Sequence, residues 1–285
     1  FRSQFLTHFM RRLKVEYLEK QRGIVNKTQE EPLLDVVHGF PGTGKSAVIS
    51  WMRRLMEEGL GWEHGTHFVC LAFQNAMAAQ INGHTVHHWS GIPARNDDGN
   101  AFGDRHKQSL KCSALRVIII DEVSMMSAEL LGTLERVVST AVRVRGTYKR
   151  RNEHTLRVFG GVNVIMCADF WQLHPVTGTF LASNPLDVPF GCAHRALEMF
   201  WESGEDSIRS FWQLTQLMRC DDEWYNAFLS ECRVGNLTMK NYSYFHGLPT
   251  LSSPCVGSCV CKKDIKNDAV IGPYRLSWAS RFLAG

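Results

Sequence analysis

The chain has 285 residues, of which 44% are hydrophobic and 21% are charged, and its formal net charge is +4. This composition is typical of a globular protein with one or two domains, and it excludes fibrous and low-complexity chains. A charge of this size is too small to indicate a nucleic-acid partner by itself. No apolar run approaches the roughly 20 residues that a membrane-spanning helix needs, so we expect no membrane partner.

The first residues do not resemble a secretory signal, because Arg11, Arg12 and Lys14 interrupt every apolar stretch there. Most of the nine cysteines are scattered through apolar segments. Scattered cysteines of this kind are typical of reduced thiols, so we expect an intracellular protein. The chain does not begin with methionine, and we therefore expect a fragment of a longer protein.

The predicted elements begin with an amphipathic helix over residues 3–22, in which Phe5, Phe9, Leu13 and Tyr17 recur every four residues. A polar linker follows to residue 32. Strands are then predicted at 33–38, 67–72, 116–121 and 162–167, and helices at 45–59, 74–81 and 127–142. Strands that alternate with helices indicate a parallel sheet covered on both faces, so we predict an α/β fold.

Three regions follow from this pattern. Residues 1–32 hold the N-terminal helix and linker, and residues 33–192 hold the α/β domain. From about residue 193 the chain becomes helical and aromatic, and we predict that 193–285 is an incomplete second domain with an irregular tail.

A glycine-rich segment lies between the first predicted strand and the next helix. Its residues are Gly39, Phe40, Pro41, Gly42, Thr43, Gly44, Lys45 and Ser46. Glycines let the backbone turn tightly and point N–H groups at phosphate oxygens, and the helix N-terminus adds partial positive charge. Lys45 would reach the β- and γ-phosphates of a nucleoside triphosphate, and Ser46 would hold Mg²⁺. The alternative is an accidental glycine turn.

Acidic and amide side chains follow two later strands. Asp121 and Glu122 end the most apolar strand, and Gln172 follows the strand at 162–167. Because ligands bind at the carboxyl ends of parallel strands, we predict that Asp121 holds Mg²⁺ and that Glu122 orients the attacking water. Gln172 would contact the γ-phosphate. The alternatives are a solvated strand end with a helix cap and an ordinary polar loop.

Five sequence blocks, in order, resemble the motifs of superfamily-one DNA helicases of the PIF (petite integration frequency) type, close to the RecD group. The blocks are residues 39–46, 70–89, 121–126, 168–176 and 214–219. The resemblance implies a RecA-like P-loop NTPase fold and the start of a second RecA-like domain. It also implies ATP and Mg²⁺ as cofactors.

By the same resemblance, the protein is an ATP-dependent helicase that moves 5′ to 3′ on single-stranded DNA and couples ATP hydrolysis to duplex unwinding. The family implies roles in DNA repair, recombination and telomere maintenance, DNA junctions as further partners, and the nucleus or mitochondrion as the compartment. Gln172 then senses the γ-phosphate. Arg219 is an arginine finger that stabilises charge on the transferred phosphoryl group.

Contact with single-stranded DNA requires aromatic faces for the bases and polar groups for the phosphates. The resemblance assigns such contacts to Phe73, Asn75, Thr85, His87 and His88. For His87, His88 and Trp89 the alternative is core packing. Residues 91–111 lie where related helicases insert a wedge hairpin, and an ordinary loop is the alternative there. The basic stretch 143–151 either binds phosphate or is a solvated hairpin.

Some features depart from the family pattern. Ala168 and His174 replace a usual Gly and Pro, and Phe73-Gln74-Asn75 replaces a Pro-Thr-Gly-like run. The late motifs are absent, so we expect most of the second RecA-like domain to be missing. Two alternatives therefore stay open. One is a P-loop ATPase that is not coupled to DNA, and the other is a catalytically incomplete fragment that binds ATP and DNA.

One further cluster, Cys255, Cys259 and Cys261, has short spacings typical of metal ligands. A tetrahedral zinc site needs four ligands, and no fourth is evident. We therefore expect free thiols rather than a zinc site in this tail.

Overall fold

A computed structural model describes residues 2–23, 30–93, 105–142, 148–152, 155–218 and 222–246. The chain divides into two compact units, residues 1–219 and 220–285. The first unit holds a six-stranded sheet whose strands are β1 (Leu34–Gly39), β2 (Phe68–Ala72), β3 (His84–Thr85), β4 (Val117–Asp121), β5 (Asn163–Ala168) and β6 (Ser210–Leu214). The strands run in the order β3-β2-β4-β5-β1-β6, and every pair is parallel. The predicted parallel α/β fold is confirmed.

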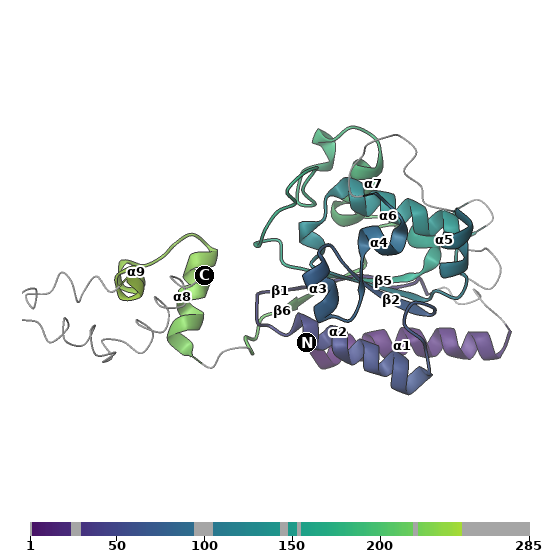
Figure 1. Cartoon of the computed structure of the whole chain (residues 1–285), viewed down its shortest axis with the longest axis horizontal. Coiled ribbons are helices and arrows are strands. Elements are labelled where there is room, and N and C mark those ends of the chain that lie inside the picture. Colours follow the sequence, from purple (N-terminus) through teal and green to yellow (C-terminus); the bar gives the residue numbers. More distant parts are fainter. Residues whose placement is uncertain are drawn as a thin grey trace, which may run out of the picture. The chain divides into compact units, whose positions relative to one another are not determined.

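Helices cover both faces of this sheet (Figure 1). One face carries α1 (Arg2–Gln21), α2 (Lys45–Arg54), which continues as a π-helical turn over Leu55–Gly59, and α3 (Asn75–Gln80). The other face carries α4 (Val86–Ser90), α5 (Arg105–Lys111), α6 (Ala128–Ala141) and α7 (Cys192–Trp201). Strands β1, β2, β4 and β5 are buried along their whole length, because both faces are covered.

The N-terminal helix belongs to this unit. Phe5, Phe9 and Leu13 of α1 are buried in the same core cluster as Val37 of β1. Tyr17, the fourth residue of the predicted apolar stripe, remains 44% exposed. Helix α1 is therefore part of the first unit's core.

The predicted domain boundary at residue 192 differs from the structure. Strand β6 pairs with β1 along Asp35–Gly39, and α7 packs on α6, so the first unit continues to residue 219. The sequence did not reveal β6 because Phe211 and Trp212 lie on an edge strand that is only partly buried. An edge strand lacks the continuous apolar run that marks the central strands.

In the second unit the structure describes α8 (Glu223–Arg233) and α9 (Met239–His246). Trp224 stacks on Phe228 at 5.5 Å and donates its indole N–H to the Asn241 side chain at 2.9 Å. These local contacts join the two helices. Across the described ranges, none of the helices has both the length and the apolar character that crossing a membrane requires.

Candidate nucleotide site

All six strands of the first unit end at the same edge of the sheet, because they are parallel. The glycine-rich loop leaves β1 at this edge and leads into α2, whose N-terminal residue is Lys45. Gly42 and Gly44 have φ angles of 82° and 91°. Residues with a Cβ rarely adopt this left-handed conformation, so the loop depends on glycine at both positions. The predicted strand–loop–helix context is confirmed.

Lys45 is the central side chain of the site. Its ammonium group donates to the Gly39 carbonyl at 2.7 Å and lies 3.8 Å from the Glu122 carboxylate. Only 7% of Lys45 is exposed. A single buried cation therefore lies between the glycine-rich loop and the acidic residues that end β4, at the place where a phosphate chain would bind.

Asp121 and Glu122 carry their charges in a poorly solvated place. Burial raises the pKa of both carboxyl groups, and Lys45 opposes that rise in each case. Asp121 and Asp169 further raise the pKa of Glu122, because they are nearby carboxylates. Perturbed carboxyl groups that gather beside a phosphate loop are typical of functional sites.

The backbone of Glu122 is strained. Its φ of 50° and ψ of 46° place a residue with a long side chain in the left-handed region. One of its carboxylate oxygens, Oε2, is buried and has no hydrogen-bond partner. Strain and an unsatisfied oxygen at one residue both cost stability, and they are retained mainly where function requires them.

Gln172 lies on the turn after β5. The carboxylate of Asp169 accepts a hydrogen bond from the Trp171 N–H at 3.2 Å, and the Asp169 carbonyl accepts one from the Gln172 N–H at 3.0 Å. Asp169 is fully buried, whereas the Gln172 side chain is half-buried. The turn therefore has a fixed base and an accessible amide at the sheet edge that also carries the glycine-rich loop.

Two residues at this edge were missed by the sequence analysis. His38, which precedes the loop, lies 3.8 Å from the Asp169 carboxylate. Arg2 of α1 donates from its guanidinium to the carbonyls of Thr43 at 2.9 Å and Gln216 at 3.3 Å. The sequence could have indicated His38, because a histidine is unusual on an apolar strand face. No local pattern indicated Arg2.

A cavity of about 600 Å³ lies beside the glycine-rich loop. It is lined by Arg2, Ser3, Leu6, Trp51, Leu214, Thr215 and Gln216. The segment after β6, which contributes Thr215 and Gln216 to this lining, also contacts the loop, because the Met218 N–H donates to the Gly42 carbonyl at 2.8 Å. The cavity is thus formed by α1, α2 and the segment after β6, which are distant in sequence.

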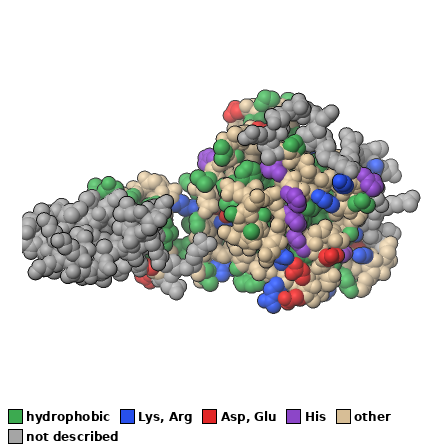
Figure 2. Space-filling view, in the orientation of Figure 1, with side chains coloured by type: hydrophobic (Ala, Val, Ile, Leu, Met, Phe, Trp, Pro, Cys, Tyr) green, Lys and Arg blue, Asp and Glu red, His purple; other side chains and the backbone are tan. Residues whose placement is uncertain are grey.

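The residues predicted to contact DNA lie at the same edge, after β2 and β3. The ring of Phe73 lies 6.1 Å from that of His87. Thr85 caps α4, where its hydroxyl accepts from the His88 N–H at 3.3 Å, while Asn75 and His88 are exposed. A line of histidine side chains is visible on this unit's surface in Figure 2, and ring contacts join His64 to His84 and His84 to His88.

Core packing, the alternative for this segment, holds for Trp89, which is 3% exposed. Helix α5, within the predicted wedge segment, is anchored to it: Lys111 donates to the Trp89 carbonyl at 2.9 Å, and Gln108 donates to that of Ser90 at 2.6 Å. Residues 94–104 of that segment, Arg219 and the three clustered cysteines lie outside the described residues.

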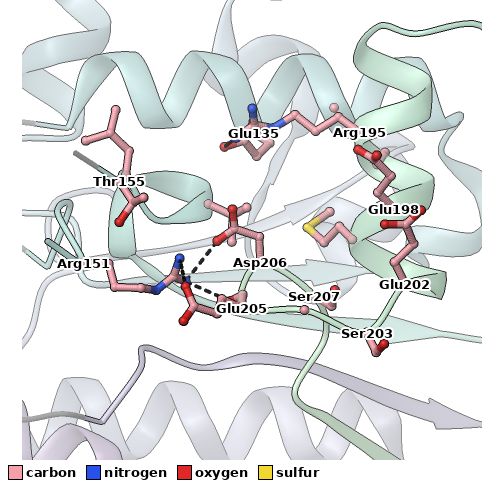
Figure 3. A pocket seen from close by; sticks show the side chains of 16 residues that line it. Glu135, Arg151, Thr155, Arg195, Glu198, Glu202, Ser203, Glu205, Asp206 and Ser207 are labelled. Carbon is pink, nitrogen blue, oxygen red and sulfur yellow. Dashed lines mark hydrogen bonds and ion pairs between the residues drawn. The ribbon is translucent and has the colours of Figure 1, made fainter.

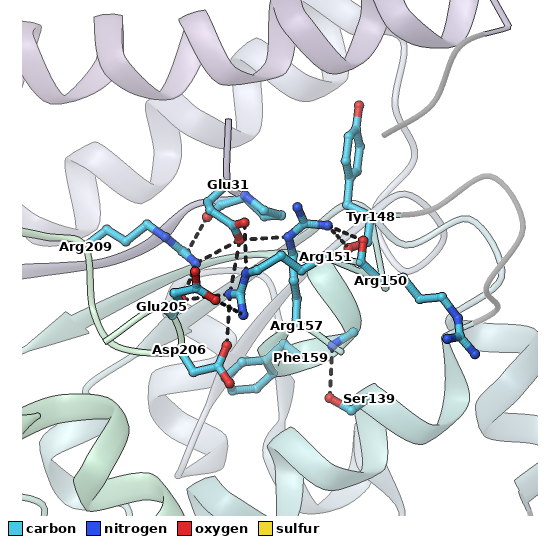
Figure 4. Close-up of polar contacts among 12 residues, drawn as sticks. Glu31, Ser139, Tyr148, Arg150, Arg151, Arg157, Phe159, Glu205, Asp206 and Arg209 are labelled. Atoms are coloured by element: carbon cyan, nitrogen blue, oxygen red, sulfur yellow. Dashed lines mark hydrogen bonds and ion pairs between the residues drawn. The ribbon is translucent and has the colours of Figure 1, made fainter. Parts of the chain in front are cut away.

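The described part of the basic stretch lies at the opposite, amino edge of the sheet. Glu31 accepts from Arg157 at 2.7 Å and from Arg151 and Arg209 at 3.1 Å each (Figure 4). Arg151 also contacts the carboxylates of Glu205 and Asp206. A cavity of about 470 Å³ lies beside this cluster, with Arg151, Glu205 and Asp206 among its lining residues (Figure 3). Arg151 is therefore engaged within the fold.

Comparison with known proteins decides the family. A sequence profile described as PIF1-like helicase matches residues 18–185, which is more than half of the chain. The chain belongs to the PIF1-like helicase family. The resemblance inferred from the five blocks is therefore confirmed, and the matched region holds the glycine-rich loop, the acidic pair and Gln172.

Over the aligned part, two curated relatives of the family have about 30% sequence identity to this chain. The human ATP-dependent DNA helicase PIF1 is 32% identical over 199 residues, covering 65% of this chain and 27% of that protein. The Saccharomyces cerevisiae ATP-dependent DNA helicase PIF1 is 29% identical over 165 residues, covering 56% of this chain and 18% of that protein. The chain thus spans less than a third of the length of these relatives.

Solved structures of the family share the fold. The crystal structure of Pif1 helicase from Candida albicans has a TM-score of 0.53 and 25% identity, covering 82% of this chain and 46% of that one. The Pif1 helicase from Bacteroides in complex with ADP-AlF3 and ssDNA has a TM-score of 0.55 and 20% identity, covering 89% of this chain and 55% of that one. These likenesses confirm the predicted RecA-like fold.

Proposed function

We propose that this chain is the nucleotide-binding motor part of an ATP-dependent DNA helicase. The observation that carries the proposal is the position of Lys45, which joins the Gly39 carbonyl to the Glu122 carboxylate. A buried cation between a phosphate loop and a strained acidic pair suits phosphoryl transfer, in which positioning and charge stabilisation do most of the work.

Each residue of the site has its own role in ATP hydrolysis. The amides of residues 39–46 cradle the phosphates, and Lys45 leaves the Gly39 carbonyl for the β- and γ-phosphates. Glu122 orients the attacking water and withdraws its proton, a role that its raised pKa supports. Gln172 contacts the γ-phosphate, and Arg219 stabilises charge on the transferred group.

Magnesium fits this arrangement. The hydroxyl of Ser46 and the carboxylate of Asp121 are hard oxygen ligands, which Mg²⁺ prefers, and Mg²⁺ usually completes its shell with phosphates and water. The buried, unpartnered Oε2 of Glu122 leaves a further acceptor for such a water. Among the described residues no His, Cys, Asp and Glu side chains form a metal site by themselves. When bound, the ion neutralises charge on the phosphates.

The cavity beside the loop would take the base of ATP. Its lining residues combine apolar Leu6 and Trp51 with polar Thr215 and Gln216. Nucleotide sites commonly pair an apolar wall with a few polar groups in this way. Arg2 lines this cavity and donates to the Thr43 carbonyl, so the wall that would take the base contacts the loop that would hold the phosphates.

Single-stranded DNA is the proposed track. Phe73 and His87 offer ring faces for bases, while Asn75, Thr85 and His88 offer polar groups for the backbone. The human and yeast relatives are named ATP-dependent DNA helicases, and the Bacteroides Pif1 structure holds ADP-AlF3 and ssDNA. As the family resemblance implies, we also propose 5′-to-3′ movement, binding to DNA junctions, roles in repair, recombination and telomere maintenance, and location in the nucleus or mitochondrion.

The test measures ATP hydrolysis and nucleotide binding by the chain with and without oligo(dT), in the presence and absence of Mg²⁺. We expect Mg²⁺-dependent ATP binding and hydrolysis that single-stranded DNA stimulates. Binding and hydrolysis that DNA leaves unchanged would support an uncoupled P-loop ATPase. Binding of both ligands without turnover would identify a catalytically incomplete motor part.

A further inference from the structure

His38 is a polar residue on the otherwise apolar face of β1 that packs under α6 and α7. Side chains alternate between the two faces of a strand, so Leu34, Val36 and His38 point the same way. Leu34 and Val36 are fully buried in an apolar core cluster, and His38 is only 7% exposed. Burial of an imidazole is costly unless its nitrogens have polar partners, so this histidine needs an explanation.

The ring of His38 lies between two aromatic side chains. It stacks on Phe170 at 6.1 Å with an interplanar angle of 10°, and on Phe211 at 5.6 Å with an angle of 29°. Its Nε2 lies 3.8 Å from the carboxylate of Asp169, which is completely buried. His38 therefore contacts both β6 and the turn after β5, through ring stacking and through a polar contact with Asp169.

The same turn presents Gln172. The carboxylate of Asp169 accepts from the Trp171 N–H, and its carbonyl accepts from the Gln172 N–H. Phe170 is held from the far side by Phe180, Phe200 and Trp201, whose ring centroids lie within 6.2 Å. Any shift of Asp169 would move the backbone that carries Gln172.

The next residue along β1 belongs to the phosphate loop. The Gly39 carbonyl accepts the hydrogen bond from Lys45, so two adjacent residues of β1 contact two different parts of the site. His38 contacts the turn that carries Gln172, and Gly39 contacts the cation that binds the phosphates. The strand is buried over its whole length, so its close packing connects these two contacts.

We propose that His38 is a positioning residue that holds the Asp169–Gln172 turn against the phosphate loop, so that Gln172 reads the γ-phosphate. This inference rests on the proposed function of the nucleotide site. A phenylalanine or leucine at position 38 would fill the same space, but only an imidazole also offers an N–H toward the buried Asp169 carboxylate. The polar contact, rather than the packing, is what the role requires.

The experiment compares the affinities of the chain for fluorescent ATP and ADP analogues with Mg²⁺, in the wild type, His38→Phe, His38→Gln and Gln172→Ala. His38→Phe keeps the stacking and removes the N–H, while His38→Gln keeps an N–H donor without the ring. His194→Phe on α7, which contacts Pro185 and Glu198, is the matched control. Thermal unfolding of each variant shows that it is folded.

The wild type is expected to bind ATP more tightly than ADP. His38→Phe and Gln172→Ala should each lower the ATP-to-ADP affinity ratio by about tenfold, the value of one hydrogen bond to a charged group, with ADP affinity unchanged. Their double variant should fall no further, and His38→Gln should recover part of the ratio. If His38→Phe folds and keeps the wild-type ratio, or weakens ATP and ADP equally, the inference is wrong.

A failure of the proposed function gives a different result. In that case the wild type binds neither nucleotide, or binds both as weakly as Lys45→Met does. A wild type that binds both nucleotides but does not distinguish them leaves the nucleotide site in place and overturns the role of His38, since there is then no γ-phosphate reading to support.

Discussion

Two charged clusters, one at each edge of the sheet, hold their carboxylates in opposite ways. At the amino edge, Glu31 is surrounded by Arg151, Arg157 and Arg209. At the carboxyl edge, Asp121 and Glu122 share Lys45 as their nearest cation among the contacts that the structure describes. One carboxylate therefore has three arginine partners at the amino edge, whereas two carboxylates share one lysine at the carboxyl edge.

The pKa directions express this difference. Burial raises the pKa of Glu31, but hydrogen bonds from Arg157 and Arg151 outweigh it and lower the pKa overall. For Asp121 and Glu122, burial prevails over Lys45 and the pKa is raised. A lowered carboxyl pKa means that the folded state stabilises the charged form, whereas a raised pKa means that the folded state destabilises it.

The Glu31 cluster and the acidic pair use charge differently. The amino edge joins the segments before β1, β5 and β6 through paired charges. At the carboxyl edge, Glu122 combines a left-handed backbone with an unsatisfied carboxylate oxygen beside the glycine-rich loop. Such costs are expected where a ligand completes the site.

Loss of the Lys45 ammonium should have the largest effect. We expect Lys45→Met to weaken Mg²⁺–ATP binding on the order of a hundredfold, since a charged contact to phosphate is lost and the apolar stem is kept. Titration with a fluorescent ATP analogue measures this loss. Near-normal affinity in a folded variant would contradict the assignment of this edge as the nucleotide site.

Loss of the Glu31 carboxylate should affect stability and spare nucleotide binding. Glu31→Ala leaves three arginines without their shared partner, and we expect the free energy of unfolding to fall by about 2 kcal/mol. Urea unfolding measures this change. The contrast between the edges fails if this variant loses ATP affinity while keeping its stability.

Neutralisation of Glu122 should increase stability and abolish activity. We expect Glu122→Gln to raise the free energy of unfolding at neutral pH by about 1 kcal/mol while abolishing ATP hydrolysis. Because the folded-state pKa of Glu122 is raised, its contribution to stability is present below the ordinary carboxyl pKa and is lost as pH rises through the raised value.

The gain from Glu122→Gln should therefore vanish in acid and grow toward neutral pH. Urea unfolding at several pH values measures it, with Glu129→Gln as the matched control, since hydrogen bonds lower the Glu129 pKa. An equal gain at all pH values would show that the charge of Glu122 is not the cause.

The smallest expected effect concerns DNA. Phe73→Leu should weaken binding to oligo(dT) about threefold, because a stacking face is lost while apolar packing is kept. Arg151→Ala should leave both the affinity and its salt dependence unchanged, because this guanidinium is engaged with Glu31 at the amino edge. Fluorescence anisotropy at several salt concentrations measures both. If the oligo(dT) affinity of Arg151→Ala depends less steeply on salt than that of the wild type, DNA contacts the amino edge and our placement of DNA is wrong.

Much of the site could be predicted from sequence because its signals are local. The glycine-rich loop needs particular residues at fixed spacing, and Asp121 and Glu122 follow a continuous apolar strand. The order of parallel strands then implies a shared edge. The γ-phosphate contact of Gln172 follows from the same edge, whereas its sensing role and the role of Arg219 came from the family resemblance. All three stay predictions.

Other features escaped prediction because they join segments far apart in sequence. Arg2 contacts Thr43 and Gln216, and Glu31 contacts arginines more than 100 residues away. No spacing rule connects such positions. The edge strand β6 escaped for a related reason, since its half-exposed residues carry no strong apolar period.

The sequence by itself determined the parallel α/β class, the nucleotide loop and the acidic pair, because each depends on short-range pattern and backbone chemistry. Only the tertiary structure decided what these residues contact: it placed Lys45 between Gly39 and Glu122 and buried His38 against Asp169. It also directed the arginines of the amino edge toward Glu31. The physical reason is that the energy of a charge depends on its solvation and its neighbours, and both arise from packing across the whole sheet.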